Sequence, residues 1–231
     1  MTSDLLKNIN FIDILGRGPR RDDVHVLSID NYLFHDDFKG PLNSKELFSI
    51  GVHPWHVKEG TSITQKLKTY AQIDNCIAIG ETGLDKLKGP SMKLQEESFI
   101  EHIRLSEELG KPLIIHCVKA YSEVMSIHKK MSPKRPWVFH DFNHNIQFIK
   151  SLTTKNIYFS LGENFIKRDQ SKISKSFREV SPEKVFFETD EMDMKIENLY
   201  EIYCDRRGID LLEFRRTIVS NFREVFDSTD L

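Results

Sequence analysis

Eight short apolar runs recur along the 231-residue chain, and they constrain its fold more than any other feature. Each has the length of a buried strand. The runs are Asn10–Leu15, Val24–Ile29, Leu47–Val52, Cys76–Gly80, Leu113–Cys117, Trp137–His140, Ile157–Leu161 and Val185–Glu188. Longer amphipathic patterns separate several of them, and strands that alternate with helices indicate parallel βαβ units. Because eight is the strand number of a closed α/β barrel, we predict a TIM-like (β/α)8 barrel.

The helical patterns lie mainly in the C-terminal two thirds of the chain. Expected helices cover Gln95–Leu109, Ser122–Met131 and Asn145–Leu152, and two further apolar stripes begin at Ile196 and Leu211. Residues 16–23 and 31–46 show no helical pattern, so we expect an incomplete outer ring of helices near the N-terminus. No linker or internal repeat interrupts the chain, and we predict one domain spanning residues 1–231.

Composition excludes several other classes of protein. Hydrophobic residues make up 39% of the chain and charged residues 29%, with a net charge of -2. This balance argues against disorder and against coating of nucleic acid through bulk charge. The chain has no apolar run long enough for a membrane span and no signal-peptide pattern. Its three widely spaced cysteines, Cys76, Cys117 and Cys204, are typical of a reducing compartment, so we expect a cytoplasmic protein.

Polar side chains end five of the eight runs. The residues are His53, Glu81, His116, His140 and Glu188, with Asp85, Asp141 and Asp190 close behind them. A single histidine or aspartate after a strand is commonly structural, for example a helix cap. In a barrel, however, the carboxyl ends of all strands meet at one face. The recurrence therefore favours one site with the mixed nitrogen and oxygen ligands of a divalent metal.

The motifs that carry these residues resemble those of a known family. Gly51–Pro54, Ile79–Asp85, Lys111–Cys117 and Glu188–Asp190 are similar, in order and spacing, to successive motifs of the TatD family. That family comprises metal-dependent deoxyribonucleases and hydrolases with an amidohydrolase-like barrel. The resemblance extends from about Phe11 to the C-terminus. It implies a hydrolase that cleaves phosphodiester bonds of nucleic acid with a metal-activated water, and single-stranded DNA is the expected substrate. The sequence leaves DNA, RNA, a nucleotide and another ester open.

The resemblance also implies roles for individual residues. Glu81 matches the carboxylate that can bridge two metals, and His116 and His140 match the ligands of one of them. Asp190 matches the residue that binds the other metal and orients or deprotonates the attacking water. Glu81 and Asp190 are thus the expected catalytic residues, and His53 is expected at the mouth of the site, facing substrate.

The first strand departs from the family pattern. Where the family has Asp-x-His-x-His, this chain retains Asp13 but has Leu15 and Arg17 in place of the two histidines. Because strand side chains alternate, these three residues share one face. We expect the Arg17 guanidinium to reach the site, where it would pair with Asp190 or Glu81 or bind a substrate phosphate.

The missing histidines leave three readings open. In the first, Glu81, His116 and His140 bind a single divalent ion (Zn²⁺, Mg²⁺ or Mn²⁺) and the enzyme is active. In the second, the barrel is a catalytically impaired pseudoenzyme that serves as a binding or assembly module. In the third, His25 or His35 supplies a donor for a second ion.

Basic residues that follow the runs are candidate phosphate contacts. Lys119 comes shortly after His116, and Lys86, Lys88, Lys167 and Arg168 hold comparable positions. Cations at the mouth of a barrel could bind a nucleic-acid backbone. They could equally be ordinary solvated side chains, and the sequence leaves both interpretations open.

Overall fold

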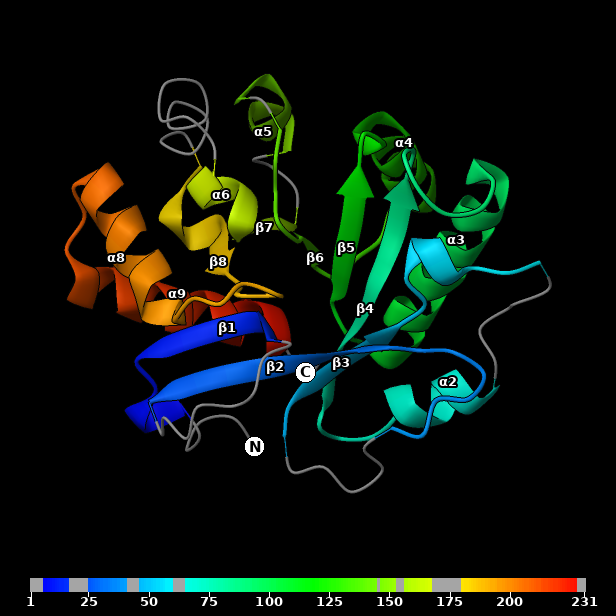
Figure 1. Cartoon of the computed structure of the whole chain (residues 1–231), viewed down its shortest axis with the longest axis horizontal. Coiled ribbons are helices and arrows are strands. Elements are labelled where there is room, and N and C mark those ends of the chain that lie inside the picture. The colour runs from blue at the N-terminus through cyan, green and yellow to red at the C-terminus, as the bar shows by residue number, and fades with distance from the viewer. Residues whose placement is uncertain are drawn as a thin grey trace. The chain divides into compact units, whose positions relative to one another are not determined.

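The computed structural model describes residues 6–16, 25–40, 46–59, 65–144, 146–152, 156–167 and 180–227 (Figure 1). Its eight strands belong to one sheet, in which they follow the order of the chain. The strands are β1 (Phe11–Gly16), β2 (Val26–Leu33), β3 (Phe48–Gly51), β4 (Cys76–Asp85), β5 (Leu113–Val118), β6 (Trp137–Phe139), β7 (Ile157–Leu161) and β8 (Val185–Phe187). This confirms the prediction of a TIM-like α/β barrel with eight parallel strands.

The helices confirm the amphipathic patterns and add two elements that were not predicted. The α-helices are α2 (Gln65–Ala71), α3 (Met92–Leu109), α4 (Tyr121–Met131), α5 (Ile146–Leu152), α6 (Glu163–Lys167), α8 (Ile196–Arg207) and α9 (Leu211–Phe226). Short 3₁₀ turns are η1 (Leu6–Asn8), η2 (Pro54–His56) and η3 (Pro182–Lys184). The sequence patterns did not predict α2 or α6, which span seven and five residues. None of the helices among the described residues is long and apolar enough to cross a bilayer.

The described residues group into two compact units, one within residues 30–139 and one within residues 1–29 and 140–228. The organisation as a single domain stays a prediction. Each unit has its own buried core and its own set of chemistry-bearing side chains.

In the unit of residues 30–139, the strands β3, β4, β5 and β6 pair in parallel, for example Ile79 with Leu113 and Leu113 with Trp137. Helix α3 packs along β4 (Figure 1). The α3 residue Phe99 meets Trp137 of β6 at a ring distance of 5.4 Å, and both side chains are fully buried. Gly110 ends α3 with a left-handed φ of 70°, as its position after the apolar pattern predicted.

In the other unit, β7 pairs with β8, and β1 lies beside β8, where Gly16 bridges to Asp190. Helices α8 and α9 pack on both β1 and β8. Their contact is aromatic: Tyr203 of α8 stacks on Phe214 of α9 at 4.7 Å. The Tyr200 hydroxyl bonds both the N–H and the carbonyl of Ile12, each at 3.0 Å, which anchors α8 to β1.

One strand boundary differs from the prediction in a way that matters for the site. The run Cys76–Gly80 was expected to end before Glu81, but β4 continues to Asp85. The register between β4 and β5 shifts between Ile79 and Thr82 and then resumes. Glu81 therefore lies inside a buried strand rather than at its end.

Candidate metal-binding site

Two glycines of β4 allow the close strand approach on which the site depends. Gly80 and Gly83 have φ values of 142° and 143°, which L side chains rarely adopt. A Cβ atom on Gly83 would lie 2.0 Å from the carbonyl oxygen of His116, and one on Gly80 would lie 2.5 Å from that of Ile114. Without these side chains, β4 and β5 bring Glu81 and His116 within reach of each other.

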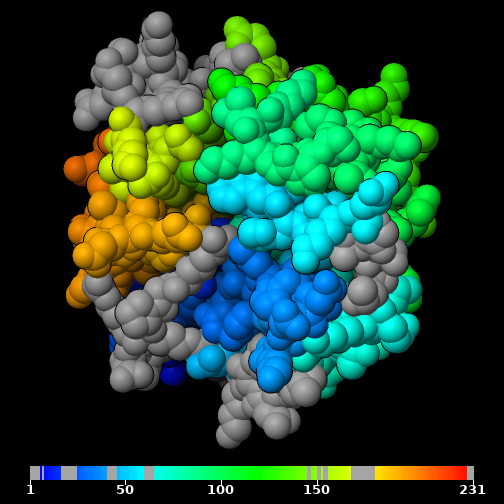
Figure 2. Space-filling model, turned by 45° about the vertical axis from the view of Figure 1, so that its right-hand side comes forward, coloured from blue at the N-terminus to red at the C-terminus, as the bar shows by residue number. Residues whose placement is uncertain are grey.

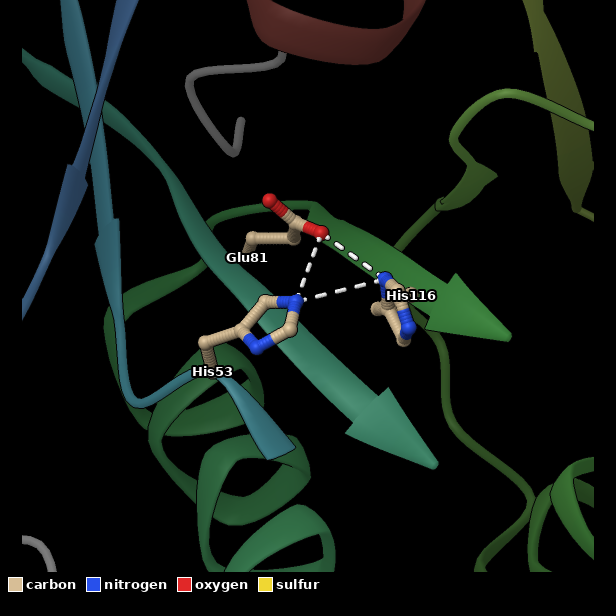
Figure 3. A group of neighbouring side chains, drawn as sticks. All are labelled: His53, Glu81 and His116. Atoms are coloured by element: carbon tan, nitrogen blue, oxygen red, sulfur yellow. Dashed lines mark hydrogen bonds and ion pairs between the residues drawn. The ribbon is translucent and has the colours of Figure 1, made fainter. Parts of the chain in front are cut away.

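Three buried side chains converge there (Figure 3). Glu81 Oε1 lies 3.0 Å from His116 Nδ1 and 3.2 Å from His53 Nε2, and the two ring nitrogens are 3.3 Å apart. The exposed fractions are 1% for Glu81, 4% for His53 and 7% for His116. One carboxylate and two imidazoles at this spacing are residue types that can hold a divalent cation such as Zn²⁺, and the hydrogen bonds of each side chain decide which of the three can serve as ligands.

The second carboxylate oxygen of Glu81 is held by a side-chain amide from strand β2. Asn31 of β2 donates its side-chain N–H to Glu81 Oε2 at 3.1 Å. The Asn31 carbonyl oxygen accepts from the Glu81 backbone N–H at 3.1 Å and from the Ser49 hydroxyl at 3.1 Å. These bonds orient the carboxylate so that Oε1 faces the two histidines.

Asp85 holds the other side of the His116 ring. His116 Nε2 lies 3.1 Å from Asp85 Oδ2, which also accepts from Trp55 Nε1 at 2.6 Å. Burial raises the pKa of Asp85, but hydrogen bonds from Trp55, the Leu87 N–H and His116 outweigh it, so the net pKa is lowered. An ionised Asp85 requires the proton on His116 Nε2, which leaves the Nδ1 lone pair directed at Glu81. A carboxylate bonded to the far nitrogen in this way is the usual support of a metal-binding histidine.

The His53 ring is held with its proton on the nitrogen that faces Glu81, whereas His116 turns its unprotonated nitrogen toward Glu81. Its Nδ1 accepts the backbone N–H of Trp55 at 3.3 Å and caps the η2 turn. A neutral ring that accepts at Nδ1 carries its proton on Nε2. The Nε2–H group therefore donates to Glu81, and His53 acts within the cluster as a hydrogen-bond donor.

A second group of polar side chains occupies the other unit. His140 Nδ1 donates to Glu188 Oε1 at 3.2 Å, and the Asp141 N–H donates to the same oxygen at 2.8 Å. Glu188 is fully buried. Asp141 accepts from the backbone and side-chain N–H groups of Asn164. Burial, followed by the charge of Glu188, raises the pKa of Asp141 to about 6.

Asp13 joins β1 to the segment after β8. Its carboxylate accepts from the Thr189 hydroxyl at 2.6 Å and from the Thr189 N–H at 3.1 Å. Burial is the largest effect on Asp13 and raises its pKa to about 6, although these hydrogen bonds lower it. The next residue, Asp190, has a φ of 45° and donates its N–H to the Leu15 carbonyl at 2.9 Å. Asp13 thus fixes the backbone that carries Asp190.

The structure places most of the residues singled out from the sequence. Glu81, His116 and His53 come together in one unit. His140 and Asp190 both lie in the other unit, and their convergence with the first three stays a prediction. Lys119 is exposed just beyond β5, with a φ of 56°.

Three further predicted donors lie outside this cluster or outside the described residues. Arg17 is not among the described residues, so its predicted ion pair lies outside the structure. His25 and His35 are exposed, and His25 Nδ1 lies 3.1 Å from the Asn8 carbonyl.

Sequence reasoning missed Asn31 and Trp55 as parts of the site, and it noted Asp85 among the polar residues of the strand ends without assigning it a role. Asp85 is the last residue of the recognised motif Ile79–Asp85, and Trp55 directly follows the motif Gly51–Pro54. Their position in the sequence, close to Glu81 and His53, could have indicated that they belong to the site. Asn31 had no such signal, because it belongs to a strand whose end was placed too early.

Eight parallel strands with buried histidine and carboxylate donors define an α/β barrel of the metal-dependent hydrolase class. The family described as TatD-related DNase matches residues 40–227. The chain therefore belongs to the TatD family of metal-dependent hydrolases. The match begins beyond the first-strand segment where this chain departs from the family pattern.

Individual relatives agree with this assignment. An uncharacterized metal-dependent hydrolase of Buchnera aphidicola is 31% identical over 186 residues, which cover 77% of this chain and 69% of the relative. The uncharacterized metal-dependent hydrolase YcfH of Escherichia coli is 25% identical over 93% of this chain and 87% of its own length. The 3'-5' ssDNA/RNA exonuclease TatD of Pantoea ananatis is 33% identical over 90 residues, covering 38% of this chain and 35% of the relative.

A solved structure supports the fold. The crystal structure of YJJV, a TatD homologue from Escherichia coli, superposes with a TM-score of 0.81 over 94% of this chain and 98% of that protein. The sequence identity is 16%, so this likeness concerns the fold alone.

Proposed function

We propose that this hydrolase cleaves phosphodiester bonds of nucleic acid, with single-stranded DNA as its substrate. The observation that carries the proposal is the buried group of Glu81, His116 and His53 in a chain of the TatD family. The Pantoea relative is named as an exonuclease of single-stranded DNA and RNA, which supports the substrate class.

The donor set fits a divalent metal ion. Glu81 and His116 would hold it, because Asn31 and Asp85 orient the coordinating atoms of both. We propose His140 and Asp190 as the further ligands, as the family resemblance implies. A bound Zn²⁺, Mn²⁺ or Mg²⁺ would supply Lewis acidity toward a phosphoryl oxygen and lower the pKa of water.

The remaining roles belong to the chain's own side chains. Asp190 would accept the proton of the attacking water. His53 would donate its Nε2–H to a phosphoryl oxygen. Lys119 and Arg17 would contact neighbouring phosphates.

We further propose that a single ion suffices. Leu15 stands where the family has a histidine, and its side chain is fully buried. An apolar residue provides no donor to replace the hydration shell of a second ion. The same observation favours the second candidate function, a pseudoenzyme that binds without cleaving.

Metal analysis combined with a digestion assay on single-stranded DNA tests the proposal. We expect at most one equivalent of metal in a chelator-buffered titration, and metal-dependent cleavage. His116→Ala should lose both, while His35→Ala, at an exposed position, should retain both. Two equivalents would refute the single-ion model. Loss of metal in His35→Ala would point to a second ion held by that residue. Protein that binds no metal and cleaves nothing would favour the pseudoenzyme.

A further inference from the structure

The Trp55 side chain is partly exposed, although a tryptophan side chain is usually mostly buried. Its side chain is 40% exposed, whereas Trp137 is fully buried. Among the described residues, the exposed large apolar side chains are Trp55, Leu87 and Leu212. Of these three, Trp55 contacts the rings of His53 and His116 directly. An exposed indole in contact with a candidate reaction centre is available to bind a ligand.

The indole is held in one orientation. Its Nε1–H donates to Asp85 Oδ2 at 2.6 Å. Its ring meets that of His53 edge-to-face at 4.7 Å and lies 5.8 Å from that of His116. Because its rotamer is already fixed, binding through this ring costs little conformational entropy.

A cation and a tight turn complete the surface. The Lys88 ammonium lies 4.2 Å from the centre of the Trp55 ring. Gly89 has a φ of 92°, and a Cβ on it would lie 2.9 Å from the Pro54 carbonyl oxygen, so the turn after β4 packs closely on η2. Figure 2 shows the cyan segment of residues 46–59 at the surface beside the teal-green segment that follows β4.

We infer that Trp55 is a nucleobase-stacking subsite, with Lys88 as the contact for the adjoining phosphate. This inference rests on the proposed function and names the part of the substrate that the site recognises. An aromatic face next to a cation is the usual platform for single-stranded nucleic acid, and it tolerates any base because every base has a π-face. A base that stacks on the Trp55 face over which the Lys88 ammonium now lies would displace that ammonium toward the adjoining phosphate, on a ring that contacts both His53 and His116.

A binding assay separates stacking from phosphate contact. The full-length chain is titrated with a short single-stranded phosphorothioate DNA that resists hydrolysis, and with the same strand lacking its 3′-terminal base. We expect quenching of the indole emission by the intact strand and about tenfold weaker binding of the abasic strand. Trp137 is buried and provides a constant background. Equal affinity for the two strands would overturn the inference.

Variants identify the residue. Trp55→Leu should lose about tenfold in affinity for the intact strand and none for the abasic strand. Trp55→Phe keeps an aromatic face but removes the donor to Asp85, so it should bind within about twofold of wild type. Equal losses in both variants would assign the effect to Asp85 instead. Leu212→Ala, at an exposed site in the other unit, is the matched control and should bind as wild type does.

The hydrolysis assay separates this inference from the proposed function. If wild type cleaves DNA, Trp55→Leu should raise KM about tenfold, whereas Trp55→Phe, which also lacks the bond to Asp85, should share any change in kcat without the rise in KM. Absence of cleavage by wild type, with quenching intact, would refute the proposed function and leave the stacking subsite supported. Cleavage by Trp55→Leu with an unchanged KM would overturn the subsite.

Discussion

His116 has a carboxylate beside each ring nitrogen, and the two carboxylates act differently. Glu81 faces Nδ1, where a metal would bind, and Asp85 faces Nε2, where the proton must stay. His140 and Glu188 form a similar pair with the nitrogens exchanged, since Glu188 accepts a hydrogen bond from His140 Nδ1. In both units, a buried carboxylate therefore selects the tautomer of a predicted metal ligand.

Asp85→Asn tests this selection. An amide accepts the His116 proton less strongly than a carboxylate, so the ring is held less firmly in its ligand form. We expect metal affinity to fall roughly 10- to 100-fold, measured by competition with a chromophoric chelator. Glu123→Gln removes a carboxylate that pairs with Lys86 at 2.6 Å in the same unit and should leave affinity unchanged. Unchanged affinity in Asp85→Asn would show that Asp85 does not position His116.

His53→Ala and His116→Ala should separate a hydrogen-bond donor from a ligand. His53 uses Nδ1 as an acceptor and presents Nε2–H, so its loss should spare metal binding and lower kcat about 10²-fold. His116→Ala should abolish metal uptake. Elemental analysis of both variants after dialysis checks the first point, and DNA cleavage the second. Loss of metal from His53→Ala would make His53 a ligand and contradict the tautomer assigned to it.

At the scale of the element, β4 carries the site because two of its residues lack side chains. Gly80 and Gly83 lie where β4 approaches β5 too closely for a Cβ atom. The same strand then extends to Asp85, so that Glu81 and Asp85 reach His116 from one element. The glycines therefore serve the geometry of the metal site as well as the packing of the sheet.

Gly83→Ala should damage stability and metal binding together. The added Cβ would meet the His116 carbonyl oxygen at 2.0 Å, which forces β5 and its histidine to move. We expect a loss of about 3 kcal/mol in the free energy of unfolding, measured by urea denaturation, and weaker metal binding.

Gly208→Ala is the matched control for Gly83→Ala. Gly208 also has a positive φ, 65°, but nothing lies within 4 Å of its added Cβ. Only the left-handed backbone should cost stability, about 1 kcal/mol, with metal affinity unchanged. Equal effects of the two substitutions on metal binding would show that the contact of β4 with β5 does not position His116.

At the scale of the whole molecule, buried His102 links stability to pH. Its Nε2 accepts the Val52 N–H at 3.0 Å and its Nδ1 donates to the Ser98 carbonyl at 2.8 Å, so the ring is neutral in the folded state. Burial lowers its pKa from 6.5 to about 4. A depressed folded pKa contributes stability above the unfolded value of 6.5, and that contribution is lost as pH falls toward 4.

His102→Gln should flatten this pH dependence. The difference in pKa corresponds to about 3 kcal/mol between pH 6.5 and 4 in the wild type. Buried Asp13 and Asp141 act in the opposite direction, because their raised pKa values of about 6 favour the folded state as pH falls. Urea unfolding at several pH values measures the net slope. We expect the variant to be less stable at pH 7 and to lose less stability on acidification. An unchanged slope would contradict a buried neutral His102.

Local patterns were sufficient to predict the class of fold. Eight runs of strand length and the amphipathic stretches between them depend only on neighbouring residues, and all eight strands were confirmed. The residue types of the site, Glu81, His116 and His53, were also evident, because motif spacing is a property of the chain. The predicted extent of β4 was wrong, because the apolar run ends just before Glu81 whereas the strand pairing continues to Asp85.

Only the tertiary structure decided how these side chains work together. The tautomer of His116 depends on its hydrogen bond with Asp85, and that of His53 depends on the backbone N–H of Trp55. Only the folded chain shows these two hydrogen bonds. Asn31 reaches Glu81 from 50 positions away in the sequence, which no local pattern encodes. Sequence by itself determined which donors exist and on which strands, because periodicity and spacing are local. The pairing of β3, β4 and β5 in space determined which His116 nitrogen faces the candidate metal site and which faces Asp85.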